Sequence, residues 1–310
     1  MITTVTLNPC IDYTAVVNRL EQGALNLMTG SRMDASGKGV NVALVLDALG
    51  VDCFATGISF ENNHNMLAGR LDSEGIPHDF VLAPGNIRTN IKLYDESAGN
   101  MTEINSTGEP VEPSTLEALA DKLDSLAARS EVVAFSGRIA NGAASDIYRR
   151  LMERLSTYPV KLAVDADGEP LAEALKAKPW LIKPNDYELG KLVGRKLETD
   201  REIVAACREL IAGGVEIVCV SLGADGALIA DKREAWRAKG LSIPVRGLQG
   251  AGDSMVAGIC KAAVEGQPLR ELLRSGMAAS AGSVIREGTL LSTKEDYLGF
   301  LSQVQIEAII

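Results

Sequence analysis

The clearest chemical signal in the chain is a turn of small residues followed by an acid. Residues 250–253 read Gly-Ala-Gly-Asp, follow an extended stretch and lead into a helical pattern through Glu265. Small residues at such a junction leave backbone N–H groups exposed, and the helix dipole adds partial positive charge. This suits a transferring phosphoryl group, with an aspartate placed to accept a proton from the attacking hydroxyl. The turn therefore predicts phosphoryl transfer by Gly250, Ala251, Gly252 and Asp253.

An ordinary structural role explains the same turn. Asp253 is of a type that often caps helix N-termini, and glycines are common in tight turns. Taken alone, the four residues favour this structural role. The interpretation as a catalytic turn depends on the other segments of the chain.

The turn must be positioned by an α/β fold. Apolar, β-branched runs bounded by turn residues alternate with helical stretches, which is typical of buried strands in a parallel sheet. The runs are residues 2–7, 53–58, 132–136, 161–165, 180–183 and 217–222. This alternation predicts a doubly wound, mostly parallel sheet with helices on both faces.

Two helix boundaries can be read from capping signals. After Pro113, Ser114 and Glu117 have the spacing of a capping box. A second helical pattern runs over residues 199–212 and stops at two glycines, which commonly end helices.

Residues 11–35 and 86–106 break this rhythm. They carry β-prone, partly alternating pieces separated by Asx- and Gly-containing turns. We expect them to form a small separate sheet, a lid over the edge of the main sheet where a ligand binds. Residues 1–10, 36–85 and 107–310 would then form the nucleotide- and substrate-binding core. A surface hairpin without a role is the alternative.

Composition limits the class of protein. A formal net charge of -10 argues against nucleic-acid binding, so an anionic ligand needs a site with its own positive charge. No stretch approaches the roughly 20 apolar residues of a membrane span, and the N-terminus does not resemble a signal peptide. Five cysteines without a C-x-x-C pair predict reduced core thiols. These features together predict a cytoplasmic protein.

Six motifs, in order along nearly the whole chain, resemble those of the ribokinase-like (phosphofructokinase B) carbohydrate kinases. Besides residues 250–253, they are Thr-Leu-Asn-Pro-Cys-Ile-Asp at 6–12, Ala-Ser-Gly-Lys-Gly-Val-Asn-Val-Ala at 35–43, Ser-Gly at 136–137, Lys-Pro-Asn-Asp-Tyr-Glu-Leu at 183–189 and Ser-Leu-Gly-Ala-Asp-Gly-Ala at 221–227. The opening motif and the Gly-Lys-Gly form are most similar to the 1-phosphofructokinase and tagatose-6-phosphate kinase branch. Residues 88–92, Arg-Thr-Asn-Ile-Lys, lean toward the former.

The resemblance implies a Rossmann-like core, ATP with Mg²⁺, and a lid that often doubles as a homodimer interface. Asp253 would be the base, and the amides of residues 250–253 an anion hole. The sugar phosphate would be bound by Asp12, Gly37, Lys38, Gly39, Asn41, Arg88 and Asn90, with Lys38 and Arg88 on its phosphate. The nucleotide would be bound by Lys183, Asn185, Ser221, Gly223 and Gly226, and Mg²⁺ positioned by Asn185 and Glu188.

Elementary chemistry agrees with these roles. Asp12 follows a strand end, where ligands of α/β sheets gather. Asn185 and Glu188 share a helix face at a spacing of three, and Mg²⁺ prefers oxygen ligands and keeps several waters. Lys38 and Arg88 supply the required positive charge. Each residue also has an ordinary alternative as a surface charge, a first-turn helix acid or a turn residue.

The chain departs from the family pattern around the sugar. Relatives carry a basic residue near Leu27, a Gly-rich turn at 59–63, Ser-Gly-Ser-Leu-Pro at 136–140 and a Ser/Thr run at 247–249. This chain has Leu27, Ser-Phe-Glu-Asn-Asn, Ser-Gly-Arg-Ile-Ala and Gly-Leu-Gln there. One hypothesis is that Arg138 replaces the missing cation in the substrate site.

The sequence favours phosphorylation of fructose 1-phosphate to fructose 1,6-bisphosphate. Tagatose 6-phosphate, fructose 6-phosphate or an unphosphorylated sugar or nucleoside are alternative acceptors. A non-catalytic sensor of sugar phosphate or nucleotide on the same fold is an alternative of another class. A nicotinamide dehydrogenase is excluded, because no G-x-G-x-x-G follows the first apolar run. The acceptor, the oligomer geometry and any allosteric regulation stay open at this point.

Overall fold

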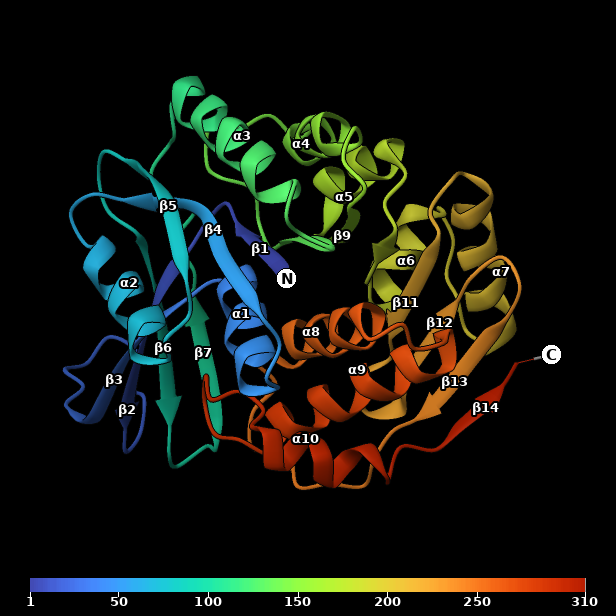
Figure 1. The fold of residues 1–310 in the computed structure, drawn as a ribbon. Helices are drawn as coiled ribbons and strands as arrows, with labels where there is room; N and C mark the ends of the chain where they lie inside the picture. Colours follow the sequence, from blue (N-terminus) through green and yellow to red (C-terminus); the bar gives the residue numbers. More distant parts are fainter. Residues whose placement is uncertain (310) are drawn as a thin grey trace.

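The structure is a computed structural model that describes residues 1–309 of the 310-residue chain. A ten-stranded main sheet is flanked by helices, and a separate four-stranded sheet stands beside it (Figure 1). The expected α/β fold with a small additional sheet is confirmed.

The main sheet is parallel over most of its width. Its strand order is β14-β13-β12-β11-β10-β9-β8-β1-β4-β5, parallel from β11 to β5 and antiparallel from β11 to β14. The strands are β1 (Ile2–Thr6), β4 (Cys53–Phe60), β5 (His78–Ala83), β8 (Val132–Ser136), β9 (Lys161–Asp165), β10 (Leu181–Ile182), β11 (Ile217–Ser221), β12 (Gly226–Ala230), β13 (Ala235–Lys239) and β14 (Ile306–Ala308). Each of the six apolar runs in the sequence contains or overlaps one of them.

The strand order reverses at β1. The strands β4 and β5 lie on one side of it, and β8, β9, β10 and β11 lie on the other. In open α/β sheets, ligands bind beyond the carboxyl ends of the strands where the order reverses. The ends of β1 and β8, at Thr6 and Ser136, therefore mark the expected site.

The helices form layers on the two faces of the main sheet (Figure 1). In one layer α1, α8, α9 and α10 contact each other in that order, and in the other α3, α4, α5, α6 and α7 do so. The helices are α1 (Lys38–Ala48), α2 (His64–Ser73), α3 (Pro113–Ala127), α4 (Ile147–Leu155), α5 (Gly168–Ala174), α6 (Asp186–Leu192), α7 (Asp200–Ala212), α8 (Ala251–Val264), α9 (Leu269–Val284) and α10 (Lys294–Leu301), with short 3₁₀ helices η1 (Leu175–Ala177) and η2 (Gly223–Asp225).

The two predicted helix boundaries have different outcomes. Thr199 caps α7 in a capping box with Glu202, and the helix ends at Gly213, as expected. The prediction that Ser114 and Glu117 form a capping box is wrong. Helix α3 begins at Pro113 with Glu112 as its N-cap, because proline is well suited to the first helical position.

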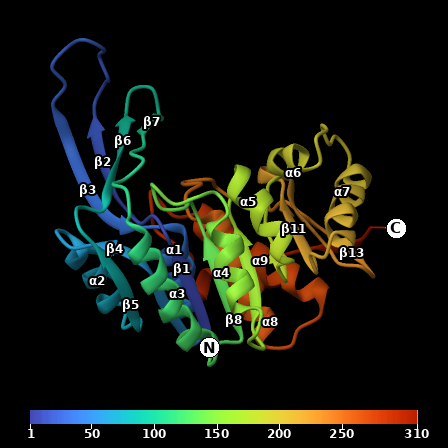
Figure 2. The same cartoon turned by 90° about the horizontal axis from the view of Figure 1, so that it is seen from above.

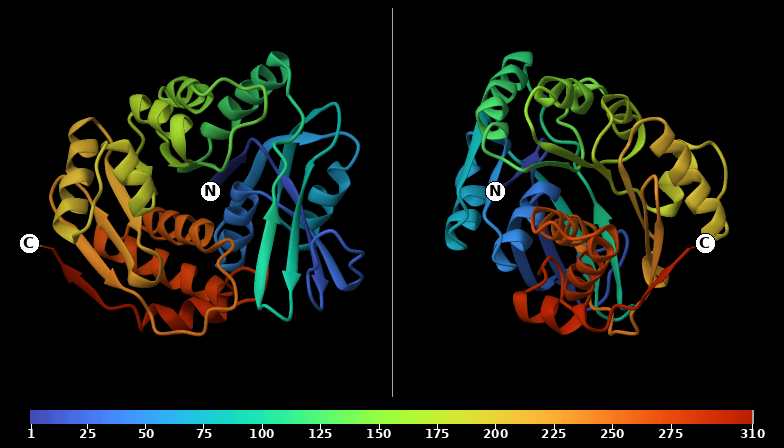
Figure 3. Two further views of the ribbon diagram at one scale, coloured as in Figure 1. Left: turned by 180° about the vertical axis from the view of Figure 1, so that it is seen from behind. Right: turned by 45° about the vertical axis from the view of Figure 1, so that its right-hand side comes forward.

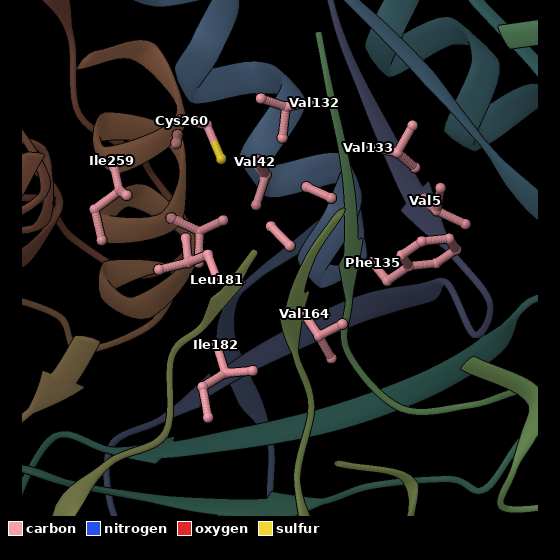
Figure 4. Close-up of a cluster of buried hydrophobic side chains, with 14 of the residues drawn as sticks. Val5, Val42, Val132, Val133, Phe135, Val164, Leu181, Ile182, Ile259 and Cys260 are labelled. Carbon is pink, nitrogen blue, oxygen red and sulfur yellow. The ribbon is translucent and has the colours of Figure 1, made fainter. Parts of the chain in front are cut away.

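Buried apolar side chains fill the space on both faces of the main sheet. Figure 4 shows Val5, Phe135 and Val164 of three neighbouring strands together with Ile259 and Cys260 of α8. Each of these side chains is at most 2% exposed, and full burial of such a side chain contributes roughly 1.5–3 kcal/mol. All residues from 253 to 260 of α8 are buried, so the turn of residues 250–253 leads into a firmly packed helix. All five cysteines are buried and free, which confirms the prediction of core thiols.

The small sheet consists of β2 (Cys10–Val17), β3 (Met28–Ser36), β6 (Arg88–Asp95) and β7 (Asn100–Ile104), in the order β3-β2-β6-β7. It projects beyond the main sheet in Figure 2 and is seen from two further sides in Figure 3. Its strand β2 follows β1 closely, and β3 leads into α1. The small sheet is thus joined to the core at the strand-order reversal. We call it the lid.

Among residues 1–309, none of the helices is both long and apolar enough to span a bilayer.

Candidate active site

The turn before α8 has the geometry of a helix N-terminus. Gly250 is the N-cap, with a left-handed φ of 72°. A Cβ at this position would also lie 2.3 Å from Cδ2 of Leu291, so only glycine fits. Asp253 lies within the first turn of α8, and the alternative that it is the N-cap is wrong.

The Asp253 carboxylate faces a cavity although its side chain is only 5% exposed. Its Oδ2 accepts a 2.7 Å hydrogen bond from the Asn41 amide. Burial raises the pKa of Asp253 to about 6, while the positive charge of Lys38 and the Asn41 bond act in the opposite direction. A base with a pKa near the working pH transfers protons efficiently.

Lys183 lies against the same turn. A Cβ on Gly252 would come within 3.2 Å of Lys183 Nζ, so the bare glycine lets the backbone approach this ammonium group. The lysine is only 6% exposed. Its charge adds to that of the helix N-terminus, which favours an anion at the turn.

A buried carboxylate that the sequence analysis missed organises two of the cations. Asp165 ends β9, is 3% exposed, and lies 3.3 Å from Lys38 Nζ and 3.4 Å from Lys183 Nζ. Burial alone would raise the pKa of Asp165, but the charges of Lys183 and Lys38 outweigh it and lower that pKa. Its position at the carboxyl end of a predicted parallel strand was the available signal.

The lid supplies a second polar cluster. The Asp12 carboxylate accepts from Asn90 Nδ2 at 3.0 Å and forms an ion pair with Lys92 Nζ at 3.1 Å. Asp12 and Asn90 are register partners on β2 and β6, so their side chains share one face. Lys92, two residues beyond Asn90 on that face, is 4% exposed and was not predicted. The period of two along a strand was the signal that could have identified it.

Arg88 is held by several polar partners. Its Nη1 donates to Asn90 Oδ1 at 2.8 Å and to the Ser106 carbonyl at 2.9 Å, and its Nη2 reaches the Asn8 carbonyl at 3.4 Å. Its Nε is buried without a hydrogen-bond partner among the described residues. The sequence assigns Lys38 and Arg88 to one phosphate, whereas the structure gives the two side chains different partners.

Arg138 borders the same cavity as Arg88, and it makes no hydrogen bond or ion pair with another described residue. Leu27 lies in the β2–β3 connection of the lid and is 77% exposed. It does not border the cavity within the described part of one chain. Arg138 therefore lies in the lining of this cavity, with its guanidinium unpaired among the described residues.

The two glycines before and within α1 differ in role. Gly37 borders the cavity and has φ of 150°, and a Cβ on it would meet Thr6 at 2.8 Å. Gly39 is buried, and a Cβ there would lie 2.7 Å from the Val5 carbonyl oxygen. Gly39 therefore lets α1 pack on β1 and does not border the cavity.

These groups surround a cavity of about 390 Å³ between the lid and the core. Its lining joins residues from both parts of the chain: Asn8, Asp12, Gly37, Lys38, Asn41, Arg88, Asn90, Lys92, Ser136, Gly137, Arg138, Gln249, Gly250, Gly252 and Asp253 are among them. We call it the sugar cavity. Four basic side chains in one small space supply the local positive charge that this acidic protein needs for an anionic ligand.

A second cavity of about 530 Å³ opens on the other side of the turn. Ser221, Gly223 and Gly226 line it, as expected, together with apolar side chains of α9 and of the segment before the turn. Ala251 and Gly252 also border it, and Gly252 is shared with the sugar cavity. Its size and apolar lining suit a purine base, so we call it the nucleotide cavity.

Asn185 and Glu188 form a capping box at the start of α6. Asn185 Oδ1 accepts from the Glu188 N–H at 2.8 Å, and Glu188 Oε2 accepts from the Asn185 N–H at 2.9 Å. Glu188 Oε1 is left available, and an amide oxygen has a second lone pair. No cluster of three or more His, Cys, Asp or Glu side chains within residues 1–309 could hold a metal alone. The donor set thus fits Mg²⁺ that takes its other ligands from phosphates and water.

The arrangement can carry a phosphoryl group from one cavity to the other. The N–H groups at the start of α8 and the nearby Lys183 favour an anion at the turn, the Asp253 carboxylate borders the sugar cavity, and further basic groups lie in its lining.

Comparisons with known proteins agree with this geometry. The chain is 34% identical over 310 residues to a 1-phosphofructokinase of Borreliella burgdorferi, covering 100% of this chain and 99% of that protein. It is 33% identical to a 1-phosphofructokinase of Vibrio cholerae, covering 99% and 97%. Among solved structures, phosphofructokinase-2 of Escherichia coli superposes with a TM-score of 0.93 at 26% identity, covering 97% and 98%.

Residues 5–296 match the profile of the pfkB family. This match spans the whole small sheet, most of the main sheet and every residue of the two cavities named above. The chain therefore belongs to the pfkB family of carbohydrate kinases.

Proposed function

We propose that this kinase transfers the γ-phosphoryl group of ATP to the 6-hydroxyl of fructose 1-phosphate, forming fructose 1,6-bisphosphate and ADP. The observation that carries the proposal is the position of residues 250–253, which border the nucleotide cavity and the sugar cavity together. The relatives named 1-phosphofructokinase, similar over the full chain, support this acceptor.

The acceptor would lie with its hydroxyls toward Asp12 and Asn41 and with its existing phosphate toward Arg88 and Arg138. Arginine binds phosphate oxygens through paired, charge-assisted hydrogen bonds. Arg88 and Arg138 both line the sugar cavity, and the Arg138 guanidinium has no partner among the described residues. An unphosphorylated sugar would leave both guanidinium groups without an anion.

Asp253 would accept the proton of the 6-hydroxyl as the oxygen attacks the γ-phosphorus and the bond to the β-phosphate oxygen breaks. The N–H groups of residues 250–253 would stabilise the charge on the transferring oxygens. Lys183 and Lys38, both paired with Asp165, would lie beside that charge. Mg²⁺, positioned by Asn185 and Glu188 with ATP, would neutralise charge on the phosphates.

A coupled assay of ADP release tests the acceptor. It would compare fructose 1-phosphate, tagatose 6-phosphate, fructose 6-phosphate, free fructose and a nucleoside at equal concentrations. We expect the highest kcat/KM for fructose 1-phosphate. A higher value for either 6-phosphate would replace the proposed acceptor, and absence of turnover with every compound would favour the sensor.

We further propose a homodimer formed through the lid. Met33, Tyr13, Ile91 and Ile104 are register partners in one row across all four lid strands, on the face opposite Asp12. Met33 and Ile104 are each 56% exposed and Ile91 is 38% exposed. An exposed apolar row of this kind is typical of an interaction surface. A tetrameric inhibited form is known for the Escherichia coli phosphofructokinase-2, so a larger assembly is the alternative.

The five buried free cysteines suit a reducing compartment, and we propose a cytoplasmic location on that basis.

A further inference from the structure

The side chain of Gln249 connects the catalytic turn of the core to the lid. Its Oε1 accepts a 2.5 Å hydrogen bond from Lys92 Nζ, and its Nε2 donates to Glu103 Oε1 at 3.0 Å. Lys92 and Glu103 are register partners on β6 and β7. The acceptor end of one amide thus meets a cation and the donor end meets an anion. Glutamine matches both partners in polarity.

Lys92 continues this connection to the sugar-binding carboxylate. It is buried, and its ammonium lies 3.1 Å from Asp12 Oδ2 as well as against Gln249. A buried ammonium is costly unless its donors are satisfied, so these contacts restrict its position. Lys92 therefore holds Asp12 and Gln249 at a defined separation.

Gln249 directly precedes the N-cap of α8. The Gly250 carbonyl accepts from the Ser254 N–H at 2.8 Å and from the Ser254 hydroxyl at 2.7 Å, so the turn is part of the helix framework. A force on the Gln249 side chain is transmitted to Gly250 through one peptide unit. Asp253 lies in the first turn of that helix.

We propose that Gln249 and Lys92 are positioning residues that set the distance between Asp12, which binds the acceptor, and Asp253, which deprotonates it. This proposal is based on three contacts: Asp12 with Lys92, Lys92 with Gln249, and Gln249 with Glu103. The inference rests on the proposed sugar-phosphate acceptor, whichever sugar phosphate that is. It explains why glutamine stands before the catalytic turn, where relatives carry a Ser/Thr run.

In-line transfer is sensitive to small displacements of the acceptor. A misplacement of about 1 Å can cost roughly 100-fold in rate. Loss of the connection should therefore lower kcat for the sugar phosphate, while KM for ATP stays unchanged because the nucleotide cavity keeps its own lining. If the connection served stability alone, its loss would lower thermal stability but would not lower kcat selectively.

The central experiment is a double-mutant cycle of Lys92→Met and Gln249→Ala, with kcat and both KM values measured for each variant. We expect each single change to lower kcat about tenfold or more, which corresponds to about 1.4 kcal/mol in the barrier. The double variant should be no slower than the slower single variant, because both changes break one connection.

A charge-swap pair tests the polarity of the connection. Gln249→Glu keeps an acceptor for Lys92 but places a carboxylate against Glu103, and we expect kcat to fall. Adding Glu103→Gln restores a matched amide–carboxylate pair, and kcat should recover. Arg246→Ala, in the same segment, removes only an exposed ion pair with Glu287 and should leave kcat unchanged.

Full kcat in the folded Gln249→Ala variant would overturn the inference, as would additive effects in the cycle. If Lys92→Met does not fold, the charge-swap pair tests the inference by itself. Failure of Glu103→Gln to restore kcat in Gln249→Glu would then overturn it. If wild type turns over no sugar phosphate, the proposed function fails instead. In that case hydrogen exchange of residues 88–104 is compared between ligand-free wild type and Gln249→Ala. Equal exchange rates in the two proteins would show that Gln249 does not hold the lid, which would overturn the inference.

Discussion

The Asn41 side-chain amide donates a 2.7 Å hydrogen bond to Oδ2 of Asp253, which is 212 positions further along the chain. Asn41 lies in the first turn of α1 and Asp253 in the first turn of α8, and the two helices pack together. This bond orients one carboxylate oxygen and leaves the other free to take a proton.

Replacement of this base should abolish turnover but not nucleotide binding. Asp253→Asn keeps the shape of the side chain and removes its basicity, so we expect kcat to fall by about 10²–10⁴-fold, the usual contribution of a general base. Isothermal titration with a non-hydrolysable ATP analogue should give a Kd close to that of wild type. Retained turnover in the variant would contradict the assignment of the base.

The pH dependence of kcat/KM, which reports groups of the free enzyme, should show the ionisation of the same group. Since burial raises the pKa of Asp253 to about 6, activity should fall as the pH drops through 6 and the carboxylate becomes protonated. A pH profile between 5 and 9 measures this limb. An acid limb near the ordinary aspartate value would show that the carboxylate is not desolvated.

The raised pKa also predicts an effect on stability. The folded protein binds a proton at Asp253 more tightly than the unfolded chain does, so this group costs stability as the pH rises from the unfolded value of 3.8 to about 6. Above pH 6 the neutral variant Asp253→Asn should therefore be more stable than wild type, by on the order of 1–3 kcal/mol. Urea denaturation at pH 7.5 and at pH 4 tests this prediction, because the gain should be smaller at pH 4.

Asp165 should be needed for both folding stability and transfer. Asp165→Asn leaves the buried ammonium of Lys183 and the half-exposed one of Lys38 without their shared carboxylate. Removing one partner of a buried ion pair costs about 3–5 kcal/mol, and exposure of Lys38 should reduce its share. Thermal unfolding and kcat should both decrease. Loss of stability with unchanged kcat would restrict Asp165 to a structural role.

Arg138 should contribute to binding of the phosphate that the acceptor carries. For Arg138→Ala we expect a KM for the sugar phosphate about tenfold higher, since a charged hydrogen bond contributes roughly 1.5–3 kcal/mol. KM for ATP should not change. Arg150→Ala, which removes an exposed arginine paired with Glu117 on the outer helices, is the matched control. An unchanged KM for every phosphorylated acceptor would reject this role.

The lid row should control the oligomeric state. Ile104→Asp places a charge in the exposed apolar row of Met33, Tyr13, Ile91 and Ile104. We expect sedimentation velocity to show a dimer for wild type and a shift toward monomer for the variant. A wild-type monomer at micromolar concentration would contradict the proposed dimer.

Local patterns were sufficient to predict the framework of this protein. The alternation of apolar runs and helical stretches predicted the main sheet, because strand burial and helix periodicity both show as patterns among residues close in sequence. The helical pattern over residues 199–212 and the turn of residues 250–253 were likewise local signals. Where two local signals competed, as Pro113 and Ser114 did at the start of α3, the predicted N-cap was wrong by two residues.

The partners within the site depended on the tertiary structure. Asp165 meets Lys38 and Lys183 only because β9 ends beside α1 and β10, and Lys92 meets Gln249 only because the lid folds over the core. The pKa of Asp253 depends on burial by elements from both ends of the chain. Propensities and motifs describe a residue among its sequence neighbours, whereas a carboxylate's charge state and partners depend on groups brought near by packing.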